Sequence, residues 1–183
     1  MDMNALLGTL LSGESIESIG KLSGATEDEV KSVLGSALPQ MLSGAQGQAT
    51  DEKTAEGFAK ALTDHAQADT SDVRGFLDGV DQIDGGKILA HLLGGSLNAT
   101  TQAAASSSGL DVGKVAKILA IAAPLLMSLL GKQTGQENSN DASAIGGLMS
   151  AFLGKTDTAG LIKLLLFGKK KKKGLLGLLL GGK

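Results

Sequence analysis

The sequence predicts an all-α, multihelical fold, and three observations support this prediction. The chain of 183 residues contains four Phe and no Trp or Tyr, so its core must be built from aliphatic side chains and Met. These residues favour helices, whereas sheets draw on β-branched and aromatic residues. Apolar residues recur at helical spacing along most of the chain, and one stretch occurs twice.

The repeated stretch relates residues 23–39 to residues 108–124 without a gap, at a constant offset of 85. Six aligned pairs are identical: Ser23/Ser108, Gly24/Gly109, Val30/Val115, Leu34/Leu119, Ala37/Ala122 and Pro39/Pro124. A duplicated stretch of this length indicates one folding unit made twice. We therefore expect two pseudo-repeated helical units, at about residues 3–49 and 85–135, around one buried central helix.

The first unit reads as three helices. Apolar residues at 6, 7, 10 and 11 predict a helix that ends at Ser12-Gly13, and those at 16, 19 and 22 predict a second that ends at Ser23-Gly24. Thr26 is a good N-cap for the third helix, and Glu29 completes a capping box. Pro39 is expected to kink this helix or to begin a new turn. Residues 43–54, rich in Gly, Gln, Ser and Thr, are expected to form a loop.

The middle of the chain contains three further helical patterns. Apolar spacing predicts helices over residues 55–62 and 73–80. Asp84-Gly85-Gly86 predicts a turn, after which a Leu-rich helix over residues 88–93 ends at Gly94-Gly95. This helix resembles the first helix of the chain at an offset of 82, so the repeat extends upstream of residue 108.

Residues 115–130 predict the central helix of the core. Only Lys117 and Ser128 are strongly polar in this stretch, and residues 118–127 are apolar on every side. Such a helix is buried all round or lies in a membrane. The apolar run is shorter than the roughly 18 residues that span a bilayer, and it contains Pro124, so we predict a core helix.

The C-terminal region changes in composition. A polar loop is expected from Lys132 to Asp141, followed by short apolar segments at 145–153 and 161–167. Five adjacent lysines then repel one another and resist burial, so the folded body should stop near Phe167. We predict a helical domain over residues 1–153 and a Gly/Leu/Lys-rich tail over residues 154–183 that is flexible or interfacial.

The net charge of −2 conceals a strong asymmetry along the chain. Residues 1–84 hold 15 acids and 5 bases, residues 85–168 hold 4 acids and 6 bases, and the tail holds six lysines. The acidic front repels phosphate backbones, whereas the tail is attracted to them or to anionic lipid. The lack of Cys excludes disulfides and thiolate metal sites. No basic stretch precedes Leu6-Leu7, so we expect a cytoplasmic protein, peripheral at the inner membrane where the tail binds lipid.

The two histidines are weak candidates for metal binding or for acid-base catalysis. His91 lies two helical turns after Asp84, which would allow a metal or catalytic pair. We instead expect a histidine on a helix face that bonds to a loop carbonyl. His65 follows Asp64 near a polar helix end and fits a solvated C-terminal turn.

Other motifs also fail as catalytic or ligand sites. The acids at 27–29 fit the first turn of a helix, and those at 78, 81 and 84 lack the Gly and the distal Glu of a calcium loop. Gly154-Lys155-Thr156 ends like a phosphate loop, but Met149 replaces its first Gly. If the second Ser-Gly turn belonged to a DNA-binding helix-turn-helix, the following helix would present only Lys114 and Lys117 before a wholly apolar run. Such a helix is poorly suited to hydrogen-bond base edges. We predict no catalytic, cofactor-binding or metal-ligating residue, and no enzyme.

A resemblance to a known family rests on three short stretches. Residues 84–95, with Asp-Gly-Gly followed by Ile-Leu-Ala-His-Leu-Leu, resemble the bacterial DUF937 family of YidB-like proteins of unknown function. The Ser-Gly-Leu turn at 108–110 and the Ala-Pro-Leu-Leu-Met stretch at 123–127 also match it. The resemblance covers about residues 3–153. It implies a multihelical, homeodomain-like fold with a buried central helix and no known activity, and it says nothing about the lysine run.

These observations favour a non-enzymatic interaction or assembly protein that acts through apolar helical surfaces, on a protein partner or on itself. No cofactor or small-molecule substrate is expected. The tail is a candidate site for an anionic membrane surface, with aliphatic side chains in the headgroup boundary beside Lys169, Lys170, Lys171, Lys172 and Lys173. A disordered soluble tail is the simpler interpretation. The alternative function is weak, salt-dependent and non-specific nucleic-acid binding through the same lysines.

Overall fold

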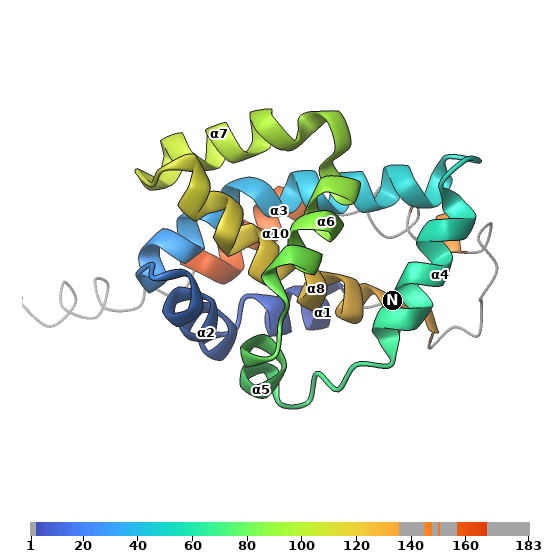
Figure 1. Ribbon diagram of the computed structural model, residues 1–183, viewed down its shortest axis with the longest axis horizontal. Helices are drawn as coiled ribbons and strands as arrows, with labels where there is room; N and C mark the ends of the chain where they lie inside the picture. The colour runs from blue at the N-terminus through green and yellow to red at the C-terminus, as the bar shows by residue number, and fades with distance from the viewer. Residues whose placement is uncertain (1–2, 136–144, 148–149, 151–156, 168–183) are drawn as a thin grey trace, which may run out of the picture.

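The computed structural model describes residues 3–135, 145–147, 150 and 157–167 of the chain (Figure 1). Within these ranges the regular elements are helices and there is no strand, which confirms the all-α prediction. Their bounds are α1 Met3–Leu10, α2 Gly13–Ser23, α3 Glu27–Thr50, α4 Ala55–Ala66, α5 Val73–Asp78, α6 Gln82–Leu93, the 3₁₀ turn η1 Gly94–Ser96, α7 Leu97–Ser108, α8 Val112–Gly135 and α10 Thr158–Phe167.

The local signals of the first helices act as predicted. The Ser12 hydroxyl accepts a hydrogen bond from the backbone N–H of Ser15 at 3.1 Å and caps α2, which ends at Gly24 with a φ of 72°. The hydroxyl of Thr26 accepts from the Glu29 N–H at 3.3 Å, and the Glu29 carboxylate accepts from the Thr26 N–H at 2.7 Å. The predicted capping box therefore starts α3.

The predicted loop over residues 43–54 is wrong, because α3 continues to Thr50. Ala45 and Ala49 extend its buried face beyond Leu42, and this tertiary burial outweighs the low helix propensity of the local sequence. Pro39 lies inside the helix, so it does not end it.

The predicted turn at Asp84-Gly85-Gly86 is also wrong, because these residues form the first turns of α6. The helix begins at Gln82, six residues before the predicted start, where the Asp81 carboxylate accepts hydrogen bonds from the N–H groups of Ile83 at 2.8 Å and Asp84 at 3.4 Å. The predicted end at Gly94 is correct.

Helix α8 is the centre of the core, as predicted. Every residue from Ile118 to Gly131 is buried, and α1, α2, α4, α5, α6 and α7 all pack against this helix (Figure 1). Among the described helices, α8 is the one that is long and apolar enough to cross a membrane, but 72% of its most apolar window is buried inside the protein. It also extends to Gly135, so the polar loop predicted from Lys132 begins too early.

The two long helices share several features that follow the sequence repeat. Both α3 and α8 have 24 residues, and their first and last residues are offset by 85. Gly24 and Gly109, with φ of 72° and 74°, precede them, and each contains one Pro. The helices that precede each long helix also pack on the other one: α6 and α7 against α3, and α1 and α2 against α8. A structural pseudo-repeat stays a prediction.

Three glycines allow the helices to cross with their backbones close together. A Cβ atom at Gly85 of α6 would overlap the carbonyl oxygen of Ala120 in α8. In the same way, Gly44 of α3 lies against the carbonyl of Leu92, and Gly131 of α8 lies against that of Leu62. Much of the core therefore depends on the absence of a side chain at these crossings.

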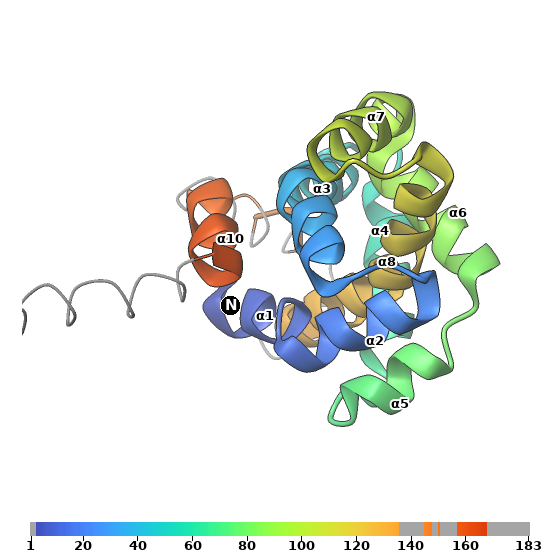
Figure 2. The same cartoon turned by 90° about the vertical axis from the view of Figure 1, so that its left-hand side faces the viewer.

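Helix α10 folds onto the body of the protein, at its edge beside α1 (Figure 2). It packs on α3 and α1, with Ile162 fully buried and Leu166 against the core. Part of the predicted tail, residues 154–183, is thus an ordered helix. The division at residue 153 is otherwise an untested prediction.

The capping box predicts a pH effect on stability. Hydrogen bonds from the backbone N–H and the hydroxyl of Thr26 lower the pKa of Glu29 in the folded protein. A lowered folded pKa gives stability that is present above the unfolded pKa of about 4.3 and is lost as the pH falls below it. In urea unfolding followed by circular dichroism, E29Q should flatten this acid-side loss.

The control is E56Q, which changes an exposed acid in the first turn of α4 whose carboxylate has no hydrogen bond within the described residues. If E56Q flattens the acid-side loss as much as E29Q does, the capping box is not its source.

Candidate functional site

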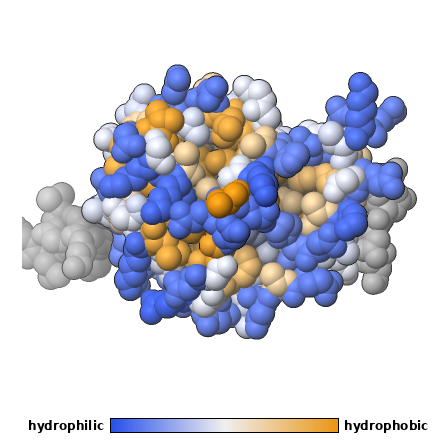
Figure 3. Space-filling view, in the orientation of Figure 1, coloured by the Kyte–Doolittle hydropathy of each residue, from blue (hydrophilic) through white to orange (hydrophobic). Residues whose placement is uncertain are grey.

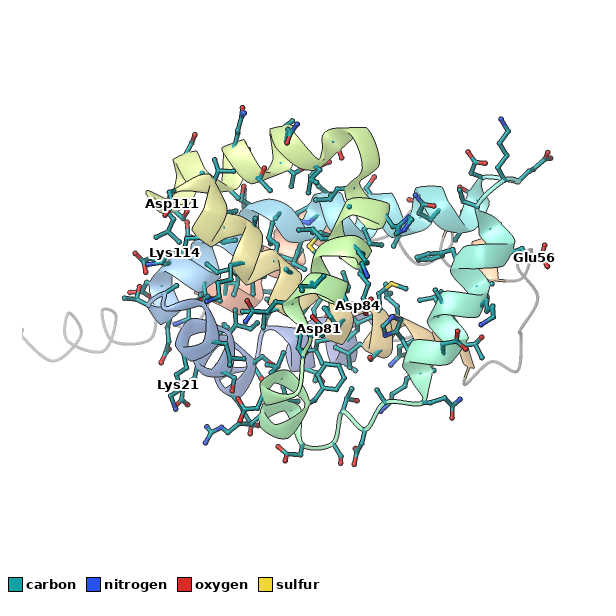
Figure 4. All side chains as sticks on the ribbon, in the orientation of Figure 1. Lys21, Glu56, Asp81, Asp84, Asp111 and Lys114 are labelled. Atoms are coloured by element: carbon teal, nitrogen blue, oxygen red, sulfur yellow. The ribbon has the colours of Figure 1, made fainter. Side chains whose placement is uncertain are left out.

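Most of the acidic residues considered in the sequence lie at helix N-termini, whereas Asp78 is the last residue of α5. Lys31 pairs with Glu27 at 3.4 Å and with Asp28 at 3.7 Å in the first turn of α3. The Asp81 carboxylate caps α6, and the Asp111 carboxylate accepts from the Lys114 N–H at 2.9 Å at the start of α8. Figure 4 shows Asp81 and Asp111 at these two helix ends. Helix capping therefore explains these groups without catalysis.

The histidines do not form a site. His91 is exposed, and within the described residues its imidazole lacks the predicted bond to a loop carbonyl. Its own backbone carbonyl instead accepts a hydrogen bond from Gln48 Nε2 at 2.8 Å. His65 lies in the last turn of α4, as predicted. Across the described part of the chain, no group of three or more His, Cys, Asp or Glu residues could hold a metal ion.

The other candidate binding sites from the sequence are the phosphate-loop motif, the lysine run and the helix-turn-helix. The Gly154-Lys155-Thr156 motif and the predicted binding residues Lys169–Lys173 lie outside the described residues. The helix that follows the second Ser-Gly turn is α8, whose burial from Ile118 onward leaves that stretch unable to enter a DNA groove.

The site that the sequence did not predict is a groove between α6, α7 and α8. Its volume is about 400 Å³, and apolar or small side chains form most of its wall (Figure 3). The lining residues are Gln82, Gly86 and Leu89 from α6, Leu97, Asn98 and Thr101 from α7, and Val112, Ala116, Lys117 and Ala120 from α8. This groove is open at the surface and is walled by three helices of the core.

Two exposed apolar side chains belong to the helices that form the groove. Ile83 is 75% exposed and lies between Gln82 and Gly86 in the chain, and Val112 is 45% exposed in the groove wall. A larger hollow of about 460 Å³ at the α3–α4 junction is lined by Glu52, Glu56 and small or polar residues. The groove is therefore the better candidate for binding an apolar group.

Exposed charges of both signs lie on the helices around the groove, among them Asp84 and Lys87 on α6. Lys117 lines the groove, and Lys87 is exposed on α6 one turn after Ile83. Within the described residues neither lysine makes an ion pair. The nearby carboxylates of Asp81 and Asp111 are instead engaged by backbone N–H groups. The groove thus has one lysine, Lys117, in an otherwise mostly apolar or small-residue wall, and Lys87 lies exposed elsewhere on α6.

Sequence reasoning missed this groove because its signal is tertiary. Ile83 and Val112 lie outside the helical patterns found in the sequence, and only the packed helices show that they belong to α6 and α8 and face water. An aliphatic residue between the polar Gln82 and Asp84 was the one local sign.

The described residues form an all-α domain with an open apolar groove between three of its helices. The family model of DUF937, bacterial protein of unknown function, matches residues 5–133, so the chain belongs to this family. Comparisons with curated proteins and with solved structures gave no match. All three helices of the groove begin within the matched residues, and α10 lies outside them.

Proposed function

We propose that this protein is a non-enzymatic interaction protein that binds an amphipathic helix of a partner protein in the groove between α6, α7 and α8. The observation that carries the proposal is the apolar groove, with Val112 exposed in its wall and Ile83 exposed on α6 directly after the lining residue Gln82. Covering a side chain such as Ile83 gives about 1.5–3 kcal/mol of favourable transfer free energy.

The shape of the groove suits a helix. The small residues Gly86, Ala116 and Ala120 leave room for the apolar face of an incoming helix, and Leu89 and Leu97 provide larger contact surfaces. Helix-in-groove recognition uses apolar anchors at positions i, i+3 or i+4, and i+7.

The charge of the groove defines the partner further. Lys117 lines the groove and Lys87 is exposed on α6, and neither lysine has an ion-pair partner within the described residues. Acidic residues beside the apolar face of the partner helix would pair with them. A second copy of this chain fits less well, because a two-fold interface brings the same patch together and would place like charges near one another.

Two synthetic peptides test this proposal on the full-length protein. Both are helical with Leu at positions i, i+4 and i+7, and they differ only in Glu or Lys residues flanking the Leu face. We expect the Glu peptide to bind about tenfold or more tightly than the Lys peptide, since one charge-assisted contact is worth about 1.5 kcal/mol or more. K117E should reduce this preference, and I83S should weaken the Glu peptide about tenfold.

Matched controls are K53E, which changes an exposed lysine between α3 and α4, and L164S, which changes an exposed leucine on α10. Neither should alter peptide binding. Equal affinity for the two peptides, or no effect of K117E and I83S, would contradict the proposal. So would a homodimer in light scattering that I83S dissociates, because it would make a second copy the occupant.

A further inference from the structure

Helix α10 has one face packed on the body and an apolar face in water. Ile162 is fully buried, and Leu166 packs against the core. A Cβ atom at Gly35 of α3 would lie 3.2 Å from Leu166 Cδ1, so the two helices are in close contact. On the outside, Leu164 is 62% exposed, Phe167 is 49% exposed, and Lys163 is exposed between the two faces.

The surroundings of α10 contain little negative charge. Its neighbour α1, Met3–Leu10, has no charged residue (Figure 2). Asp157 precedes α10, and its carboxylate accepts a hydrogen bond from the Gly160 N–H at 2.9 Å, so it serves as a cap. Of the two helices at this edge, α1 therefore adds no charge, and the one carboxylate at the start of α10 is engaged as a cap.

The sequence adds a strong positive charge directly after this face. Residues 158–183 hold seven lysines and no acidic residue, and five of these lysines begin two positions after Phe167. Residues 3–135 by contrast hold 15 acidic and 9 basic residues. The positive charge is thus concentrated in the C-terminal part of the sequence, which also contains the exposed Leu164 and Phe167.

We infer that α10 and Lys169–Lys173 together bind the surface of an anionic lipid bilayer. Leu164 and Phe167 enter the boundary between headgroups and acyl chains, Lys163 lies at headgroup level, and the five lysines attract anionic headgroups. A single apolar helix face binds membranes weakly, and a polybasic segment supplies the second signal that stable binding requires. The inference goes beyond the groove and does not depend on it.

The exposed apolar residues favour lipid over nucleic acid as the partner. Five lysines would attract either polyanion. Only a bilayer offers an apolar phase directly below its charged surface, so only lipid binding gains from Leu164 and Phe167.

Vesicle co-sedimentation of the full-length protein tests this inference. We expect binding to phosphatidylcholine vesicles that contain phosphatidylglycerol, and weak binding to phosphatidylcholine alone or at high salt. Changing K169, K170, K171, K172 and K173 together to Gln should reduce the affinity more than about a hundredfold. L164S should reduce it several-fold, and I83S, which alters an even more exposed apolar residue on α6, should leave it unchanged.

A fluorescence measurement locates the contact directly, because the chain has no Trp. F167W should show a blue shift on addition of anionic vesicles, whereas I83W should show none. The inference would be overturned by equal binding to neutral vesicles or by an unchanged affinity in L164S. It would also be overturned if the Trp emission of vesicle-bound F167W stayed that of a solvent-exposed side chain. Binding to duplex DNA that is tighter than binding to anionic vesicles would overturn it as well. Since I83S and L164S affect different ligands, failure here is distinct from failure of the groove proposal.

Discussion

Replacing Gly85 by Ala should destabilise the protein by about 3 kcal/mol, a large effect for adding one methyl group. The reason is the close crossing of α6 and α8, where the new Cβ would overlap the carbonyl oxygen of Ala120. Backbone cannot move aside as a flexible side chain can, so the two helices must separate. Chemical denaturation followed by circular dichroism measures the loss as a lower midpoint with a similar slope.

The matched control is the neighbouring residue of the same helix. A Cβ atom at Gly86 would meet no atom within 4 Å, so G86A should gain up to about 1 kcal/mol from the better helix propensity of Ala. Equal effects of G85A and G86A would contradict the close crossing, because propensity alone would then explain both.

The second large effect is expected at Ile118, in the centre of the core. This side chain is fully buried on α8, and truncation to Ala removes apolar contacts and leaves a cavity. I118A should therefore destabilise the protein by about 2–5 kcal/mol in the same denaturation experiment.

The control makes the same substitution at an exposed position. Ile83 is 75% exposed, so I83A should change the free energy of unfolding by less than about 0.5 kcal/mol. A loss in I83A as large as that in I118A would mean that Ile83 is part of the core, and the proposed groove surface would then be wrong.

Local chemistry made the early part of the fold predictable. The Thr26–Glu29 capping box, the Gly24 helix end and the buried face of α3 all depend on residues within a few positions of each other. The central helix was predictable for a different reason: residues 118–127 contain no polar group that would require water. In both cases the sequence pattern and the final packing agree.

The errors occurred where glycine serves tertiary packing. Gly44 and Gly85 suggest loops or turns when they are considered locally, because glycine weakens helices. In the structure each is helical and lies against the backbone of another helix, at Leu92 and Ala120 respectively. The stability gained from these close helix crossings depends on residues far away in the chain. Turn and helix signals within a few residues therefore could not identify it.

The candidate site was less predictable than the fold. The lysines that the sequence singled out lie outside the described residues, whereas the groove depends on which apolar residues remain uncovered after folding. Exposure of Ile83 is a property of the packed helices, because the sequence pattern began this helix only at residue 88 and left Ile83 outside it.

The most direct measurement of the central claim is a methyl NMR titration of the full-length protein with the Glu-flanked peptide. We predict that the methyl signals of Leu89, Leu97 and Val112 shift together and that those of Leu164 do not move, because the first three lie in the groove wall. The absence of shifts at the groove, or shifts confined to another surface, would contradict the assignment of this groove as the binding site for a partner helix.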